Sequence, residues 1–454
     1  MKFLNAYYTR TWLLLTAVLI PLLAGAQTNS GEADRLRLSL QEATDLALEQ
    51  NFTIEQAAYD ADKSQSQFRQ TNAVFLPQLT VEYNALSTDD PLNVFGFKLK
   101  QERVTQQDFN PVLLNDPETT ENYSASLNVR QPLLNPDILM KRRAARHQME
   151  SANEQLNGTR DMIEFQVRNQ YYSLILYRRQ IEVLETALET ASEHRRQAQN
   201  YFEQGMISKE DYLAARVYEL EMESQKISTE NKLSEAEEGM ALLLGLDGIT
   251  QIIPSGHLSK TATVPLSENL IQAPVTNSMT RAIDLRVKAA EAMVTSANFS
   301  FLPKINLFGS YEFNDSEFAG FDASSYTIGA NLTWNLFSGF SNIGKQMEAT
   351  ADYRKAQSMQ ESNQLEQQRQ VRNAYRGLEH ARHQLELADE SIARSEEDVK
   401  IRSNRFDEGM ARTTDLLEAE TKLAEARLNQ IAALYSYNIN IARLEMLLER
   451  NLTN

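Results

Sequence analysis

The chain has 454 residues, a formal net charge of −17 and no cysteine. The acidic balance argues against nucleic acid as a partner, because binding to a phosphate backbone requires a basic surface. The lack of cysteine excludes disulfides, thiolate metal sites, cysteine nucleophiles and an N-terminal lipid anchor built on that residue. Aromatic residues make up only 8% of the chain, and Gln, Glu, Ala, Arg and Leu fill long stretches, a composition typical of extended helices.

The first 26 residues are typical of a secretory signal peptide. Lys2 and Arg10 supply positive charge, an apolar run of about a dozen residues follows, and small residues precede the predicted cleavage between Ala26 and Gln27. The alternative is a membrane anchor, but a helix needs roughly 20 apolar residues to cross a bilayer. No later segment approaches that length. Any crossing of a membrane would therefore have to be made by strands.

Four later segments alternate apolar and polar residues with a period of two, at about 78–86, 122–131, 304–313 and 325–334. This pattern predicts strands, and their length matches the roughly 9 to 11 residues of a tilted membrane-spanning strand. Aromatic residues gather near the segment ends, as they do at membrane interfaces: Phe75, Tyr123, Phe301, Phe313, Tyr326 and Trp334. A soluble β-sandwich shows the same alternation. The long helical stretch between the two strand pairs disfavours a single sandwich core.

Long helix hairpins are predicted at about 137–244 and 339–449, because apolar residues recur there at spacings of three, four and seven. Each hairpin is broken once, at Gly205 and at Gly409. A helix of about 65 residues extends roughly 100 Å, which favours a tube over a globule.

The two halves of the chain repeat one another. Residues of the first half recur 204 positions later, with Phe202, Gly205, Met206 and Asp211 matching Phe406, Gly409, Met410 and Asp415. The Phe-Leu-Pro that ends at Pro77, before the first strand pair, recurs 226 positions later as the one that ends at Pro303. Because this shift is longer than 204, the first strand pair contains extra residues, which form an enlarged loop at about 89–120. This loop is a candidate lid or binding loop. The predicted organisation is a first repeat at 27–245, an irregular connector at 246–275 and a second repeat at 276–454.

In its order and duplication, this pattern resembles the outer membrane efflux protein family, the TolC-like exit ducts. The matching features are the Leu-Ser-Leu-Gln-Glu-Ala start at 38–43, Phe-Leu-Pro before each outgoing strand, and Leu-Phe-Ser-Gly-Phe at 336–340. Each hairpin end adds an aromatic residue shortly before a glycine, followed by Asp-x-Leu. The resemblance covers essentially the whole mature chain.

The resemblance implies a mainly α fold with a membrane β-barrel portion. Three copies, each with four strands, would form a twelve-stranded barrel continued by an α-helical periplasmic tunnel. Independently of the resemblance, the sequence requires an oligomer, because four strands leave open edges and bacterial membrane barrels begin at eight strands. Two or three copies would satisfy closure, and the resemblance implies three. The implied function is a passive exit duct in the cell outer membrane, extending into the periplasm. It would serve a tripartite efflux or type I secretion system with a periplasmic adaptor and an inner-membrane pump.

Three acidic residues are candidates for a periplasmic constriction. Asp415 and Glu418 lie one turn apart and match positions where the family carries acidic residues, and Asp211 repeats Asp415. In a trimer each would form a ring that attracts cations. The alternative is an acidic helix start that is favourable with the helix dipole, whatever the function. Ala214 stands at the position that repeats Glu418, so only the second hairpin carries both acids.

The glycines and methionines at the two hairpin ends, Gly205, Met206, Gly409 and Met410, allow the chain to reverse, and the resemblance implies that they also contact the adaptor. His380 and His383 share a helix face, but no metal-binding pattern surrounds them, so we predict no metal. No catalytic motif is present, and we predict neither an enzyme nor a cofactor. A periplasmic adaptor or a coiled-coil scaffold without a pore are the alternative functions.

Overall fold

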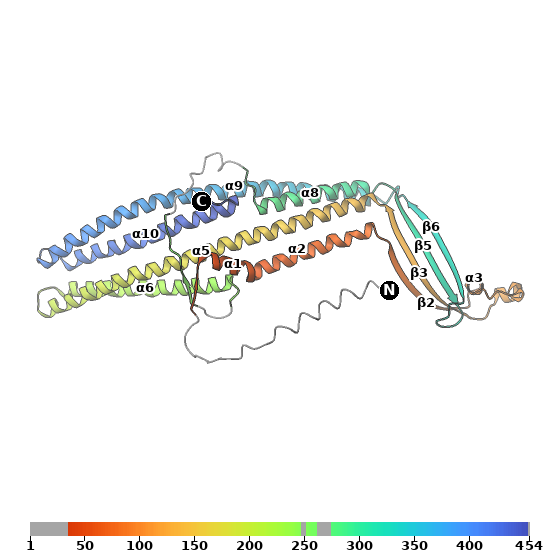
Figure 1. The fold of residues 1–454 in the computed structure, drawn as a ribbon, viewed down its shortest axis with the longest axis horizontal. Coiled ribbons are helices and arrows are strands. Elements are labelled where there is room, and N and C mark those ends of the chain that lie inside the picture. The colour runs from red at the N-terminus through yellow and green to blue at the C-terminus, as the bar shows by residue number, and fades with distance from the viewer. Residues whose placement is uncertain (1–34, 247–250, 261–273, 453–454) are drawn as a thin grey trace.

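The computed structural model describes residues 35–246, 251–260 and 274–452 (Figure 1). The predicted signal peptide and its cleavage point, Ala26 and Gln27, lie outside the described residues. Long helices extend from one end of a four-stranded sheet and make the molecule strongly elongated. Within the described ranges, no helix is both long enough and apolar enough to cross a membrane.

The first repeat begins with strand β1 (Arg35–Leu38), helices α1 (Leu40–Gln50) and α2 (Phe52–Gln70), and a short 3-10 helix at Thr71–Val74. The strand pair β2 (Gln78–Thr88) and β3 (Thr120–Leu134) follows, then the helix hairpin α5 (Pro136–Glu203) and α6 (Lys209–Leu243). The enlarged loop between the strands contains α3 (Pro91–Lys100), a 3-10 helix (Gln106–Phe109) and α4 (Pro111–Asn115).

The second repeat has the same order of elements. Helix α8 (Ser278–Phe299) leads into β5 (Lys304–Asp315) and β6 (Ala323–Thr333), and the hairpin α9 (Ser341–Asp407) and α10 (Thr413–Leu448) ends the chain. Strand β4 (Gln251–Pro254) precedes them, within the connector that the sequence indicated to be irregular. It forms because Leu36 of β1 pairs with Ile252 in parallel register, which buries Ile252 completely.

The four long strands form one antiparallel sheet in the order β2-β3-β5-β6. The register places like residues side by side. One apolar row crosses the whole sheet, through Val81, Leu127, Tyr311 and Tyr326. The next row is polar, through Glu82, Ser126, Glu312 and Ser325. Because successive side chains of a strand point to opposite faces, the sheet has one apolar face and one polar face.

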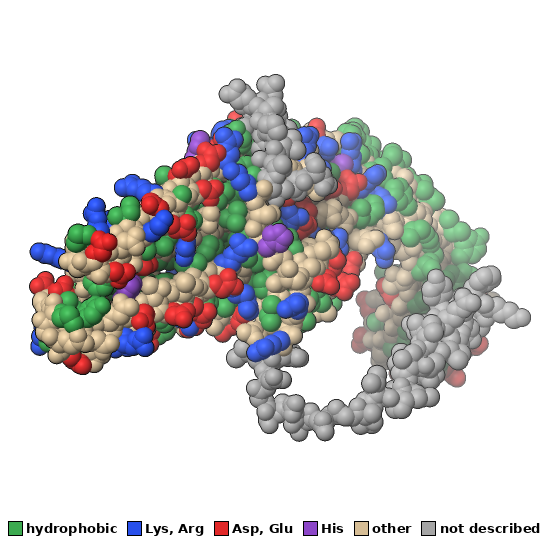
Figure 2. All heavy atoms as spheres, turned by 60° about the vertical axis from the view of Figure 1, so that its left-hand side comes forward, with side chains coloured by type: hydrophobic (Ala, Val, Ile, Leu, Met, Phe, Trp, Pro, Cys, Tyr) green, Lys and Arg blue, Asp and Glu red, His purple; other side chains and the backbone are tan. Residues whose placement is uncertain are grey.

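The apolar face of the sheet is exposed. Val81 is 76% exposed and Tyr326 is 74% exposed, and Figure 2 shows hydrophobic side chains gathered over the sheet. An apolar surface of this extent marks contact with lipid or with another protein. Phe308 is the exception to the alternation, since it lies on the polar face. Its ring covers Gly329, where an added Cβ would lie 2.6 Å from a ring carbon.

Each helix hairpin has its own apolar core. In the first repeat, Val167 and Leu174 of α5 pack with Met240 of α6. In the second repeat, Val371 and Leu378 of α9 occupy the corresponding core positions, beside Leu444 of α10. Burial of these side chains stabilises each hairpin by about 1.5 to 3 kcal/mol per residue.

A hydrogen bond between helix ends is also duplicated. The Asn51 side chain begins α2 and donates to the Leu243 carbonyl oxygen over 2.9 Å. The Asn277 side chain begins α8 and donates to the Leu447 carbonyl oxygen over 3.2 Å. In both repeats the same residue type therefore joins the first helix to the end of the hairpin.

Candidate functional site

The end of the first hairpin reverses through a left-handed glycine. Gly205 has a φ of 74°, and the Met206 amide donates to the Tyr201 carbonyl oxygen over 2.8 Å, which closes the last turn of α5. Ser208 then begins α6, and its hydroxyl accepts a hydrogen bond from the Asp211 amide over 3.1 Å. The Asp211 carboxylate in turn contacts the Ser208 hydroxyl at 2.6 Å. Asp211 thus forms one half of a capping box.

The second hairpin ends in the same geometry. Gly409 has a φ of 71°, and the Met410 amide donates to the Arg405 carbonyl oxygen over 2.7 Å. The Asp415 carboxylate accepts a hydrogen bond from the Arg412 amide over 3.2 Å. Both aspartates therefore stabilise a helix start, as the alternative interpretation of the sequence expected. Their proposed role in a constriction stays a prediction.

Glu418 lies one turn further along α10 and has two cationic partners. Its carboxylate contacts Lys422 Nζ at 2.6 Å and Arg402 Nη1 of α9 at 3.7 Å. The hydrogen bond from Lys422 and the charges of Lys422 and Arg402 lower the pKa of Glu418. The side chain is therefore ionised at neutral pH. Arg402 also donates to the Asp415 carbonyl oxygen over 3.0 Å, which fastens the start of α10 to α9.

The methionines at both hairpin ends are largely exposed. Met206 is 61% exposed and Met410 is 68% exposed. Figure 2 views the molecule with the hairpin ends brought forward, and it shows acidic and basic side chains interspersed on the helices. The hairpin ends thus present apolar side chains next to charges of both signs.

The two hairpins pack against each other close to these ends. Leu417 of α10 joins a buried cluster with Ala198 of α5 and Tyr218 of α6. Burial, together with the nearby Glu420 carboxylate, raises the pKa of Tyr218 to about 12. The rings of Tyr201 and Phe406 lie 6.5 Å apart. The structure therefore brings the candidate residues of both hairpins to one end of the molecule.

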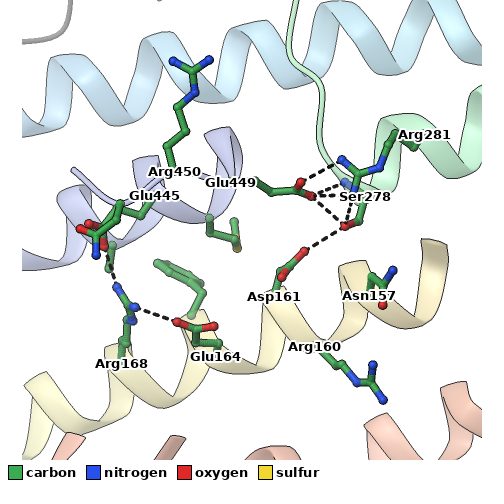
Figure 3. Close-up of a pocket in the computed structure, with 14 residues that line it drawn as sticks. Asn157, Arg160, Asp161, Glu164, Arg168, Ser278, Arg281, Glu445, Glu449 and Arg450 are labelled. Carbon is green, nitrogen blue, oxygen red and sulfur yellow. Dashed lines mark hydrogen bonds and ion pairs between the residues drawn. The ribbon is translucent and has the colours of Figure 1, made fainter. Parts of the chain in front are cut away.

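A second charged cluster lies midway along the helices, and sequence reasoning missed it. It lines a cavity of about 510 Å³ between α5, α8 and α10 (Figure 3). Glu449 accepts hydrogen bonds from the Ser278 amide and hydroxyl, and its carboxylate lies 2.8 Å from Arg281 Nη1. Arg168 of α5 contacts Glu445 of α10 at 2.6 Å.

This cluster holds the second repeat to the first, since α5 belongs to one and α8 and α10 to the other. Glu449 stands at the end of α10 with a φ of 46°, a left-handed conformation that residues other than glycine rarely adopt. The residue 204 positions earlier is Gly245, also left-handed, with a φ of 68°. This difference between the repeats was the sequence signal that could have located the cluster. A glutamate at a position where the other repeat has a turn glycine indicates that its side chain makes a specific contact.

The six predicted interface aromatics form two groups at opposite ends of the sheet. Phe75, Phe301 and Trp334 lie at the end next to the helices, where the Trp334 indole donates to the Phe301 carbonyl oxygen over 3.0 Å. Tyr123, Phe313 and Tyr326 lie toward the other end. That these two groups mark the two membrane interfaces stays a prediction.

His380 and His383 lie on α9, and His383 Nδ1 is 3.7 Å from Glu386. No group of His, Asp or Glu within the described residues could hold a metal ion.

Two curated proteins are similar to the chain. It is 20% identical to the outer membrane protein TolC of Vibrio cholerae over 72% of this chain and 77% of that protein. It is 23% identical to the alkaline protease secretion protein AprF of Pseudomonas aeruginosa, over 90% of this chain and 84% of that protein. Among solved structures, the CmeC outer membrane channel of Campylobacter jejuni superimposes with a TM-score of 0.77 at 17% identity, covering 95% of this chain and 93% of that one.

A family model described as outer membrane efflux protein matches residues 43–246 and 272–449, which include both repeats. The predicted fold class, with a duplicated strand-hairpin and helix-hairpin unit, is confirmed. So is the interpretation as an exit duct of the outer membrane that extends into the periplasm, in preference to an adaptor or a scaffold without a pore. The chain belongs to the outer membrane efflux protein family.

Proposed function

We propose that three copies of this chain assemble into one duct and that the sheet edges close it. The observation that carries the proposal is a four-stranded sheet with an exposed apolar face and two outermost strands, β2 and β6. Pairing of each β6 with the β2 of the next copy removes all open edges. Twelve strands then surround a polar interior, with the apolar face toward lipid.

The long helices continue this interior across the periplasm. At 1.5 Å per residue, the 68 residues of α5 extend about 100 Å. Three copies with two hairpins each surround a tunnel whose inner end lies at Gly205 and Gly409. The tunnel itself consumes no energy.

At the inner end, Glu418, Asp415 and Asp211 supply the negative charge of a constriction. Glu418 is the principal member, because its carboxylate is ionised and is not used to begin a helix. Repeated by threefold symmetry, it forms a ring that attracts cations and repels anions. Arg402 and Lys422 restrain the ring and limit its selectivity.

The exposed methionines at the hairpin ends are the contact for a periplasmic adaptor, which joins the duct to an inner-membrane pump. Methionine side chains adapt to irregular partner surfaces, and the neighbouring charges set the orientation of docking. A photo-crosslinking residue at Met206 or Met410 is expected to capture an adaptor in intact cells. The same residue at exposed Lys63 of α2 is the control. Equal capture at Lys63 would argue against this contact.

The constriction is tested by the double substitution Asp415→Asn and Glu418→Gln in planar bilayers. We expect a lower cation-to-anion permeability ratio, because six carboxylates leave the proposed trimer. The control is Asp60→Asn with Asp62→Asn, which removes the same charge from exposed sites on α2. An unchanged ratio in the first variant would refute the constriction. Chemical cross-linking that stops at dimers would refute the trimer.

A further inference from the structure

The enlarged loop of the first strand pair has a defined structure at the ends of the strands farthest from the long helices (Figure 1). Asp90 begins α3, since its carboxylate accepts a hydrogen bond from the Asn93 amide over 2.9 Å. Lys98 of α3 binds Asp108 of the following 3-10 helix at 2.7 Å. That ion pair and the Thr105 amide lower the pKa of Asp108 to about 2. The loop is thus internally braced.

Helix α3 contacts strands of the sheet other than the one that it follows. It follows the outermost strand β2, yet it contacts β3, β5 and β6. The residue after α3, Gln101, is only 5% exposed, and its side-chain amide donates to the Glu121 carbonyl oxygen and to Asn122 Oδ1, both over 2.9 Å. Asn122 in turn donates to Asn314 Oδ1 of β5 over 3.0 Å. These bonds fix the end of α3 on two neighbouring strands.

The face that α3 covers is the polar one. Asn122 and Asn314 belong to the polar side of the alternation, with Ser124 and Glu312. Lys100 Nζ of α3 lies 3.1 Å from Glu312 Oε1, so its side chain reaches inward along β5 from the end of the sheet. Because the apolar face meets lipid in the proposed trimer, α3 lies on the inside of the duct.

We propose that α3 is a crossbar that narrows the cell-surface mouth of the duct and excludes large solutes from the outside. Three crossbars, one from each copy, surround the opening. The inference rests on the proposed trimer, since only a closed sheet turns the polar face into an interior. The turn between β5 and β6 in the second repeat has no matching helix, so each copy contributes one crossbar.

The first test measures access from outside the cell, and the absence of native cysteine makes it direct. Ser310→Cys places a thiol on the polar face, two residues inward from Glu312. We expect a small maleimide to label it, and a maleimide carrying a bulky polyethylene glycol chain to label it several-fold less. Replacing residues 89–119 by the turn sequence of residues 316–322 should equalise the two. Glu317→Cys, in the exposed outer turn, is the control and should react with both reagents in both backgrounds.

A second variant keeps the loop at full length, in case the replacement fails to fold. Lys100→Glu places two carboxylates together and should increase bulky labelling at Ser310→Cys several-fold. Adding Glu312→Lys restores an opposite pair and should restore the exclusion. Equal labelling by both reagents with the native loop in place would overturn the crossbar. Absence of labelling even by the small reagent, in every background, would instead overturn the proposed duct interior.

Discussion

The ends of the two hairpins have the same backbone conformation but carry different side chains on one surface. In the second hairpin, Glu418 lies between Arg402 and Lys422. The matching positions of the first hairpin hold Ala214, Ala198 and Tyr218, and the last two are buried against α10 of the same chain. The first hairpin thus has an apolar contact surface inside the chain, and the second has a charged counterpart, which would face a neighbouring copy in the proposed trimer. A charged contact surface is weaker and more easily opened than an apolar one.

The repeats also differ where each hairpin returns to its first helix. Gly245 leaves no room for a side chain, because an added Cβ would lie 2.7 Å from the Gln50 carbonyl oxygen. Glu449 occupies the same place in the second repeat and uses its carboxylate to hold Ser278 and Arg281. The first junction is therefore closed by backbone packing and the second by a charged side chain.

The largest effect is expected from Ala198→Arg, which gives the first hairpin the residue of the second. Ala198 is buried in the apolar cluster with Leu417, and an arginine side chain placed there would be charged and would disrupt this packing. We expect a loss of about 4 kcal/mol in the free energy of unfolding. Thermal unfolding followed by circular dichroism measures it. The reverse change, Arg402→Ala, should cost less than about 1 kcal/mol, because that side chain is partly exposed. Similar losses for both would contradict the distinction between the two contact surfaces.

Gly245→Ala tests the first junction. The new Cβ meets backbone, which cannot rotate away, and the left-handed φ is itself unfavourable for alanine. A destabilisation of about 2 kcal/mol is expected, seen as a lower unfolding temperature of the assembled protein. Gly339→Ala is the matched control, since Gly339 is also left-handed but an added Cβ there meets nothing within 4 Å. Wild-type thermal stability in Gly245→Ala would show that the close approach to Gln50 is unimportant.

Glu449→Gln tests the second junction and its dependence on pH. Burial raises the pKa of Glu449, but hydrogen bonds from Arg281 and Ser278 outweigh it, so the pKa is lower than 4.5. A lowered carboxylate pKa stabilises the folded state above about pH 4.5, and the contribution is lost as the pH falls through the folded-state value. We expect the variant to be less stable by about 1 kcal/mol at pH 7, with allowance for screening by water. The difference should shrink as the pH falls below 4.5 through the lowered pKa; a constant difference would implicate another group.

The sequence predicted the features that depend on periodicity. The alternation around Val81 and Tyr326 located the strands, and the recurrence of Gly205 as Gly409 located the hairpin ends, because both patterns are local. It did not predict that Glu418 is held by Arg402 or that Glu449 reaches Ser278. These two contacts join residues from different helices, and their partners are fixed by how the helices pack. Strand β4 was missed for the same reason, since only its pairing with β1 makes it a strand.

The smallest effect is expected from Ala214→Glu, which adds to the first hairpin the acid that it lacks. The new carboxylate would lie near Ala198 and Tyr218 instead of Arg402 and Lys422, so neither matching position supplies a cation to restrain it. If both hairpins line the constriction, the cation-to-anion permeability ratio in planar bilayers should rise. The rise should be small, equivalent to less than about 1 kcal/mol, because water screens the charge. Ala214→Gln, of the same size without charge, is the control. An unchanged ratio, alongside a reduced one in Glu418→Gln, would mean that the second hairpin alone lines the constriction and that the first serves to support it.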